Sequence, residues 1–448
     1  MFQRILLPID NSRYSDMGLE LAMSLAQKAG STIVGFHAYA ARLHQVRFGQ
    51  LEASLPQKYQ EPSALEKQRM AHASLIGRGL ELISRSYLQR CTVLCRERGI
   101  TFEERIAEGK NYSEIVKEAN QGYDLVVIGA RGIGSDDGQV VGSVCNRVVR
   151  GLVEHDVLVL KQKADLGGTT LVALDGSPCS QRGFYLALAL ARAFGGDIEA
   201  VSAYDSEFHH RVFQNLVGVL SDEAGKLFNF QEQQRLHQDV IDGGMAKLCQ
   251  EHLKWAEDAA LQAGVPFCGQ VLTGKATTTI ARYVRQRRPS LVVAGRFGVH
   301  HEEGMDLGST VESLLFHAPA NLLIAANGIR WSQEAQEKLE RVPQGIAREL
   351  TQQRVEEMAK RQGERTVTPE LMETKYAQWA QGSANAQSKL SWIPEAKERM
   401  ERVPPFIRGM VAKSIEAYAR MKGITEVTSE LVDEAKAYWE NTGDFHLR

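Results

Sequence analysis

The sequence predicts two doubly wound α/β domains, each built on a five-stranded parallel sheet, followed by an all-α region. Short apolar runs alternate with amphipathic helical segments, as is typical of parallel sheets covered by helices. The same pattern occurs a second time about 165 residues further along the chain. Strand signals stop near Arg330, and two copies of a helical pattern follow. We therefore expect domains over residues 1–163 and 168–327 and helical repeats over 330–385 and 390–448.

Composition excludes several classes of protein. The 448 residues carry a net charge of −2, so no bulk positive charge favours a nucleic-acid partner. The first residues lack the apolar core of a signal peptide, and no apolar run is long enough to span a membrane. The six cysteines form no CxxC pair. Cys91 and Cys95 are spaced so that they can share a metal or a disulfide, but we expect them to be buried thiols. Together these features predict a cytoplasmic protein without membrane spans.

Each element of the first domain follows from local sequence. The first strand is predicted at Arg4–Ile9, and Gly30 ends the helix that follows it. About 60 mostly helical residues come after the second strand, with the strongest helical pattern at Leu75–Cys95. A short helix is predicted at Ser113–Asn120. The other strands are predicted at Thr32–Ala38, Ile100–Ala107, Asp124–Ile128 and Asp156–Leu160.

The second domain repeats these elements. Thr170–Leu174 and the following Asp175 match the first strand and Asp10. Ile198–Ala203 matches the second strand, and Asn321–Ala325 matches the fifth. Because a repeat this long indicates domain duplication, we expect an intramolecular pseudo-dimer whose two fifth strands form the contact.

Glycine-rich loops carry the strongest functional signal. Residues 129–143 read GARGIGSDDGQVVGS, and residues 295–309 read GRFGVHHEEGMDLGS. Both copies have a glycine, two residues, a glycine, nine residues and then Gly-Ser. Each loop follows an apolar strand and precedes a helix. Glycines admit an anion close to backbone N–H groups, and a helix N-terminus adds oriented donors. This arrangement predicts phosphate binding.

A carboxylate accompanies each loop. In open parallel sheets, ligands bind at the carboxyl ends of the strands where the strand order reverses. Asp10 ends the first strand and Gly129 ends the fourth, so we expect them to lie close together. Asp10 and Asp175 can then accept hydrogen bonds from a ribose or an adenine amine. The alternative is that both aspartates cap the following helices.

These residues carry a resemblance. Both α/β units resemble universal stress protein domains of the nucleotide-binding branch, in the Gly-x2-Gly-x9-Gly-Ser pattern and in the turns DNSRYS and DGSPCS. The resemblance implies a Rossmann-like fold that binds ATP, ADP or AMP, with the base beside Ala38 or Ala203. It places the nucleotide in the first domain against Asp10, Gly129, Arg131, Gly132, Gly142, Ser143 and Val144. The corresponding residues of the second domain are Asp175, Gly295, Gly298, Gly308, Ser309 and Thr310.

The two copies differ, and neither resembles a committed hydrolase. Arg131 can pair with a phosphate, whereas Phe297 cannot, although Arg296 lies beside it. Acidic residues at 136–137 and 302–303 allow a bound Mg²⁺, but a solvated loop is the preferred interpretation. The chain lacks a Walker motif and a general base, so we expect no catalytic residues and at most slow ATP hydrolysis.

Repeated histidines suggest an alternative. The insertions after the second strands contain LHQVRF with His44 and FHHRVF with His209. Histidine at one position in both copies can ligate haem or a metal, which would make the chain a tetrapyrrole or metal carrier. Helices that pack on one another explain the same pattern, and we commit to no metal ligands.

The helical region also carries a resemblance. Residues 331–343 match residues 392–404, and 363–379 match 423–439. The second copy is similar to the small helical domain of one subunit of light-independent protochlorophyllide reductase. We expect the aromatic residues Trp392, Phe406, Tyr418 and Trp439 to form a core rather than a porphyrin pocket. We also expect these repeats to dock an unknown protein partner, and the tandem chain to be able to form a homo-dimer.

Overall fold

The structure is a computed structural model with two separate units. Unit 1 spans Met1–Gly328 and unit 2 spans Ile329–Arg448. The structure describes residues 2–134, 140–205, 243–302, 304–326, 329–342, 346–362, 364, 366–384, 390–401, 403 and 405–442. No helix among these residues is long and apolar enough to cross a membrane.

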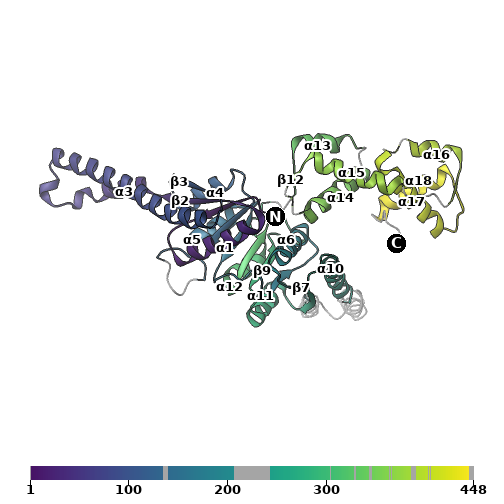
Figure 1. Cartoon of the computed structure of the whole chain (residues 1–448), viewed down its shortest axis with the longest axis horizontal. Helices are drawn as coiled ribbons and strands as arrows, with labels where there is room; N and C mark the ends of the chain where they lie inside the picture. Colours follow the sequence, from purple (N-terminus) through teal and green to yellow (C-terminus); the bar gives the residue numbers. More distant parts are fainter. Residues whose placement is uncertain are drawn as a thin grey trace, which may run out of the picture. The chain divides into compact units, whose positions relative to one another are not determined.

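Unit 1 is built on one continuous ten-stranded sheet (Figure 1). Its strand order is β3-β2-β1-β4-β5-β10-β9-β6-β7-β8, so each half has the same internal order. The first half comprises β1 (Arg4–Pro8), β2 (Thr32–Tyr39), β3 (Phe102–Glu108), β4 (Leu125–Gly129) and β5 (Asp156–Leu160). The second comprises β6 (Thr170–Ala173), β7 (Ile198–Tyr204), β8 (Phe267–Thr273), β9 (Leu291–Gly295) and β10 (Asn321–Ala325).

The two halves join at the predicted contact. β5 and β10 pair antiparallel, with Leu158 opposite Leu323. All other strand pairs of this sheet are parallel. The prediction of an intramolecular pseudo-dimer through the fifth strands is therefore confirmed. The two five-stranded sheets merge into one because β5 and β10 exchange backbone hydrogen bonds instead of packing face to face.

Helices cover both faces of the sheet. One apolar core lies under α1 (Arg13–Ala29), α3 (Pro62–Glu97), α6 (Pro178–Phe194) and α10 (Gly243–Gln262). The other lies under α4 (Asn111–Ala119), α5 (Ser143–Gly151), α11 (Ala276–Arg287) and α12 (Ser309–His317). Ser12 caps α1, and Gly30 ends it in the left-handed conformation that favours glycine. Cys91 and Cys95 of α3 are buried free thiols, as predicted.

Buried charges break the symmetry between the two domains. Asp156, the first residue of β5, is fully buried and forms two hydrogen bonds of 2.5 Å with Arg182 of α6. Lys161 Nζ donates to three carbonyl oxygens at the end of α12. In the duplicated pattern Asp156 corresponds to Asn321, and Arg182 corresponds to Met17. The Asp156–Arg182 pair therefore matches domain 1 to domain 2 and would not form between two copies of either.

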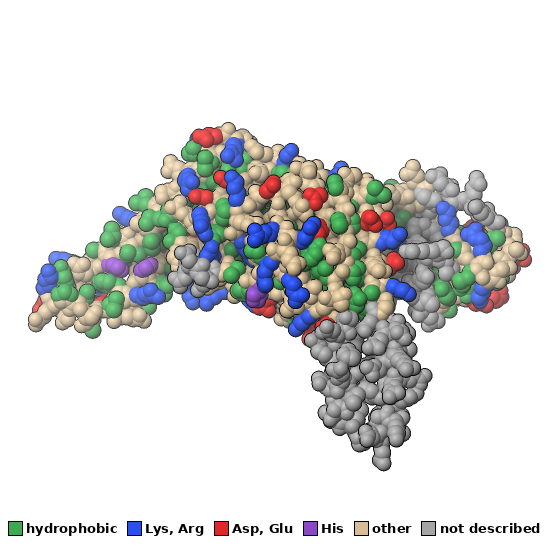
Figure 2. All heavy atoms as spheres, turned by 90° about the horizontal axis from the view of Figure 1, so that it is seen from below, with side chains coloured by type: hydrophobic (Ala, Val, Ile, Leu, Met, Phe, Trp, Pro, Cys, Tyr) green, Lys and Arg blue, Asp and Glu red, His purple; other side chains and the backbone are tan. Residues whose placement is uncertain are grey.

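The first insertion forms a projecting arm. α2 (Ala41–Leu51) packs against α3, which extends beyond the sheet (Figure 1). Two short 3-10 helices, Glu52–Ser54 and Gln57–Tyr59, join them. Figure 2 shows apolar side chains along this arm. Leu75 and Leu82 of α3 are exposed. His44 on α2 is also exposed, whereas His209 lies outside the described residues.

Unit 2 consists of two similar helical repeats. The first contains α13 (Gln333–Glu340), α14 (Ile346–Gln362) and α15 (Pro369–Ala384), and the second contains α16 (Pro394–Glu401), α17 (Pro405–Met421) and α18 (Ser429–Thr442). Each repeat has its own apolar core, and α15 packs on α17. Trp392, Tyr418 and Trp439 belong to the second core, as predicted, and the Phe406 side chain lies outside the described residues.

Short strands in unit 2 correct the prediction that strands end at Arg330. β11 (Arg330–Trp331) pairs with β12 (Thr366–Val367), and β13 (Ser391–Trp392) pairs with β14 (Glu426–Val427). Both pairs are parallel and two residues long. A strand this short has no alternating pattern that a sequence can reveal.

Candidate functional site

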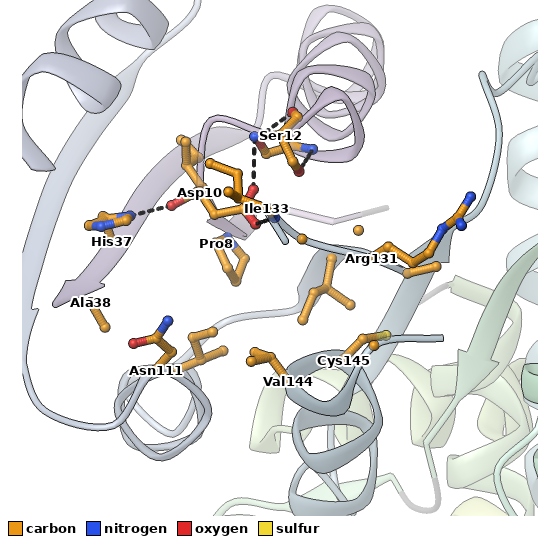
Figure 3. A pocket seen from close by; sticks show the side chains of 18 of the residues that line it. Pro8, Asp10, Ser12, His37, Ala38, Asn111, Arg131, Ile133, Val144 and Cys145 are labelled. Carbon is orange, nitrogen blue, oxygen red and sulfur yellow. Dashed lines mark hydrogen bonds between the residues drawn. The ribbon is translucent and has the colours of Figure 1, made fainter. Parts of the chain in front are cut away.

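A cavity opens in domain 1 where the strand order reverses. β1 lies between β2 and β4, and its carboxyl end forms one side of a cavity of about 260 Å³ (Figure 3). The opposite side is formed by the loop after β4 and the first turn of α5. All eight residues predicted for the first site line this cavity: Asp10, Ala38, Gly129, Arg131, Gly132, Gly142, Ser143 and Val144.

Asp10 connects the two sides of the cavity. Its Oδ1 accepts a hydrogen bond from the Ser12 N–H at 3.0 Å, and its Oδ2 accepts one from the Ile133 N–H at 3.1 Å. Ser12, not Asp10, caps α1, because Ser12 Oγ accepts the N–H of Ser15. The capping interpretation of Asp10 is therefore wrong. The carboxylate instead holds the glycine-rich loop against the end of β1.

Steric contacts explain two of the glycines. A Cβ at Gly132 would lie 2.4 Å from Asp10 Oδ2, and a Cβ at Gly129 would lie 2.6 Å from Tyr14 Cβ. A Cβ at Gly142 would meet nothing closer than 3.5 Å, an ordinary contact. Gly142 precedes α5 as its N-cap, so the free N–H groups of this helix face the cavity beside Ser143 and Val144.

The side chain of Arg131, in the glycine-rich loop, points away from the other polar side chains of the cavity. Arg131 Nε donates to the Tyr14 hydroxyl at 2.7 Å, and its guanidinium lies over the Tyr14 ring. Figure 3 shows it pointing away from Asp10, His37 and Asn111. Arg131 therefore lines the edge of the cavity while its charge is held by Tyr14.

Four further polar residues line the cavity and were not predicted as site residues. These are Ser12, Ser15, His37 and Asn111. His37 Nδ1 lies 2.5 Å from the Ile9 carbonyl oxygen, which anchors the ring beside Ala38. Figure 3 shows the Asn111 amide at the same end, on the first turn of α4. Asn111 follows Gly109-Lys110, a pair that recurs in the second domain as Gly274-Lys275.

The second domain repeats the carboxylate tether. Asp175 Oδ1 accepts the Ser177 N–H at 3.0 Å, and Oδ2 accepts the Val299 N–H at 3.2 Å. A Cβ at Gly298 would lie 2.6 Å from Asp175 Oδ2. The other predicted residues of this site keep their matching positions. Ala203 is on β7, Gly295 ends β9, Gly308 is the N-cap of α12, and Ser309 and Thr310 begin α12.

Two side chains make the second loop different. Phe297 is 3% exposed, and its ring centre lies 4.1 Å from that of His301. Arg296 is fully buried and donates to the carbonyl oxygens of Val149 and Asp306. Burial lowers the pKa of its guanidinium to about 10. Arg296 thus joins the second loop to the α5 helix of domain 1, and its charge is not presented to a ligand.

No group of three potential metal ligands occurs in the part of the chain that the structure describes. The acidic residues Asp136, Asp137 and Glu303 of the two loops lie outside it.

Comparison with known proteins identifies both parts of the chain. The model of the universal stress protein family matches residues 1–161 and 168–326. The model of the proto-chlorophyllide reductase 57 kD subunit matches residues 331–375 and 392–436.

Individual relatives agree with these matches. A light-independent protochlorophyllide reductase subunit from Heliobacterium modesticaldum is 40% identical over 65 residues, 14% of this chain and 12% of that protein. The same subunit from a Synechococcus strain is 43% identical over 54 residues, 12% of this chain and 11% of that protein. The chain therefore spans only a small part of these curated relatives.

Two solved structures are similar to part of this chain. A universal stress protein from Archaeoglobus fulgidus has a TM-score of 0.47 at 16% identity and covers 72% of this chain and 98% of its own. A putative universal stress protein from Pseudomonas aeruginosa has a TM-score of 0.46 at 15% identity and covers 72% of this chain and 93% of its own. The family model matches most of the chain, in two copies that coincide with the two halves of the sheet. The chain belongs to the universal stress protein family and contains two of its nucleotide-binding folds in tandem.

Proposed function

We propose that the cavity of domain 1 binds an adenine nucleotide, ATP or its products ADP and AMP, and that the chain regulates a partner in response. One observation carries this proposal. The carboxyl ends of β1 and β4, a glycine-rich loop and a helix N-terminus all border one cavity. Backbone N–H groups at a helix N-terminus suit phosphate oxygens, and strand-order reversal is where such folds bind nucleotides.

The residues around the cavity divide by chemistry. The phosphates lie beside Gly132 and against Gly142 and Ser143, where the first turn of α5 and the Ser143 hydroxyl border the cavity. The base lies at the opposite end, near Ala38 and Asn111. Asn111 carries both an amide donor and an amide acceptor, the combination that an adenine edge needs. The Asp10 carboxylate retains lone pairs beyond its two loop bonds and accepts from the ribose or the adenine amine.

The corresponding residues of domain 2 form a second, weaker site in this proposal. Asp175, Ala203, Gly295, Gly298, Gly308, Ser309 and Thr310 are its members. Phe297 and the interface-bound Arg296 give this loop no cation for phosphate. A sensing role fits both sites better than catalysis, because the described lining residues of the domain 1 cavity include no carboxylate besides Asp10, which is already committed to two backbone N–H groups.

Two matched glycine variants test the site. The purified chain is first denatured and its released nucleotides are separated by chromatography. ATP binding is then titrated by calorimetry, with and without Mg²⁺, in wild type, Gly132→Ala and Gly77→Ala. The new methyl group at Gly132 displaces Asp10 and breaks a charge-assisted bond, a loss of about 1.5–3 kcal/mol. We expect affinity to fall between about tenfold and a hundredfold.

Gly77→Ala serves as the control, because Gly77 lies on α3 outside the cavity and the added methyl group meets nothing within 4 Å there. We expect its affinity to stay within about threefold of wild type. Unchanged binding in Gly132→Ala, or an equal loss in both variants, would contradict the site assignment. Gly298→Ala is the matching change in domain 2 and reports the second site.

Unit 2 is proposed as the part that docks a protein partner.

A second candidate function rests on the 40% identity to a protochlorophyllide reductase subunit, namely a tetrapyrrole carrier that uses the helical repeats or His44 and His209. Tyr418 and Trp439 are 5% and 6% exposed, which favours a packed core over a pigment pocket. An absorbance spectrum of the purified chain separates the two, since a bound tetrapyrrole gives a strong band near the ultraviolet edge of the visible range.

A further inference from the structure

The ten-stranded sheet ends in two edge strands with opposite character. β3 and β8 each pair with one neighbour, β2 and β7, and lie at opposite ends of the strand order. An edge strand presents unpaired backbone N–H and C=O groups, and proteins usually protect such edges with charge. β3 reads FEERIAE, whereas β8 reads FCGQVLT. Four of the seven residues of β3 are charged, and none of β8 is.

The charged side chains of β3 form ion pairs and hydrogen bonds within domain 1. Glu103 pairs with Arg4 and with Arg105, and Glu104 lies within hydrogen-bond distance of Thr92. A second strand approaching β3 would meet these charges directly. β3 is thus a protected edge.

β8 has no comparable protection. Cys268, Gly269 and Gln270 are three consecutive exposed residues at its centre. β8 has a partner strand only on its β7 side among the residues that the structure describes. The strand contains neither proline nor a charged residue. An exposed, uncharged edge of this length is suited to strand addition.

We propose that β8 is a dimer interface, where a second copy of this chain adds its own β8 in antiparallel orientation. β5 and β10 already pair within the chain, so β8 is the edge left for association. Pairing β8 on itself about Gln270 sets Gly269 opposite Val271 and Cys268 opposite Leu272. No like charges meet in this register, which unites two ten-stranded sheets.

Symmetry favours a dimer in which β8 pairs with β8 over one in which β3 takes part. β8 on β8 is a twofold contact that closes at two chains, whereas β8 on β3 is head-to-tail and continues without end. Pairing β3 on itself about Arg105 would set two arginines opposite one another. β8 paired on β3 would set Glu103 and Glu104 against uncharged residues, which would desolvate both carboxylates.

Cysteine cross-linking provides a direct test. Directly opposed residues in an antiparallel pair have Cα atoms about 4.5–5.5 Å apart, within the range of a disulfide. The full-length chain carries Cys268→Ser, to remove the native exposed thiol, together with Gln270→Cys. Arg105→Cys in the same background is the matched control, because Arg105 holds the corresponding register position on β3.

Mild oxidation of dilute protein should give a covalent dimer with Gln270→Cys and none with Arg105→Cys. The same measurement is made with Val271→Cys and with the native Cys268. Only the residue at the twofold centre lies opposite its own copy, so the position that cross-links reveals the register. Efficient cross-linking at one β8 position supports the proposal and identifies the register. Cross-linking at no β8 position, or equally at Arg105→Cys, overturns it.

Sedimentation velocity supplies a second, independent measurement. Gln270→Lys places two lysines opposite one another, and we expect the dissociation constant of the dimer to rise about tenfold or more. Arg105→Lys should leave it unchanged. A wild-type chain that remains monomeric at its highest soluble concentration, or a dimer that is insensitive to Gln270→Lys, overturns the proposal. Circular dichroism verifies that both variants fold.

Discussion

The buried ion pair between the two stress protein domains gives the sharpest prediction of stability. Arg182 and Asp156 form two parallel hydrogen bonds of 2.5 Å, and their side chains are 5% and 0% exposed. Arg182→Met keeps an apolar stem but removes the guanidinium. Asp156 then keeps the Ala326 N–H, which lies 2.9 Å from Oδ1, while it loses both bonds to Arg182. Breaking a buried pair in this way costs about 3–5 kcal/mol.

The assay is urea unfolding of wild type, Arg182→Met and the control Arg85→Met. Arg85 pairs with Glu81 four residues earlier on α3, and the two side chains are 62% and 43% exposed. A surface pair of this kind contributes little to stability, so we expect Arg85→Met to unfold close to wild type.

The loss of stability in Arg182→Met should also depend on pH. Removal of the Arg182 guanidinium takes away a cation that favours the charged form of Asp156, so the pKa of this carboxyl is higher in the variant than in wild type. The variant's native state then binds more protons than that of wild type, so its loss of stability relative to wild type shrinks as the pH falls from 7 to about 5. A loss no larger than that of Arg85→Met, or one that grows at low pH, would refute this reasoning.

Two further predictions concern the same unit. Burial lowers the pKa of Lys161 from 10.5 to about 8. As the pH rises, the Lys161 ammonium therefore loses its proton at a lower pH in the native chain than in the unfolded chain. Unfolding measurements between pH 8 and 10.5 should therefore show the stability of wild type rising relative to Lys161→Met by roughly 2–3 kcal/mol, and a flat difference would count against it. Gly176 and Gly195 both have positive φ, but only a Cβ at Gly176 would collide with a side chain, 2.4 Å from His252 Nε2. We expect Gly195→Ala to lower the free energy of unfolding by about 1 kcal/mol and Gly176→Ala by clearly more, and equal losses would contradict the steric argument.

Local sequence predicted the elements that local forces form. The strands DVLVL and NLLIA occur at the predicted residues, because a fully buried parallel strand needs a continuous apolar run. Gly30 ends α1, and Thr368 and Thr428 accept N–H groups at the starts of α15 and α18. The spacing of the glycine loops and the family resemblance together predicted eight residues that line the cavity of domain 1.

Other features of the site had no local signal. The sequence left open whether Asp10 caps α1, but Ser12 is the cap. The Asp10 carboxylate accepts the Ile133 N–H, a group that only the folded loop brings to it. Arg296 appeared beside a phosphate loop in the sequence, and the structure buries it against α5 of the other domain. The side chain of Arg131 turns to Tyr14, a residue 117 positions away.

The sequence by itself determined most of the secondary structure of unit 1, the duplication and the position of each glycine loop, because these depend on periodicity and backbone freedom within a few residues. The tertiary structure alone decided that β5 and β10 pair antiparallel, that Asp156 meets Arg182, and that β8 is left as an uncharged edge. Those contacts join residues far apart in the chain. Burial raises the free-energy cost of leaving a charge or a backbone polar group unpaired. These groups become buried only when the domains pack together.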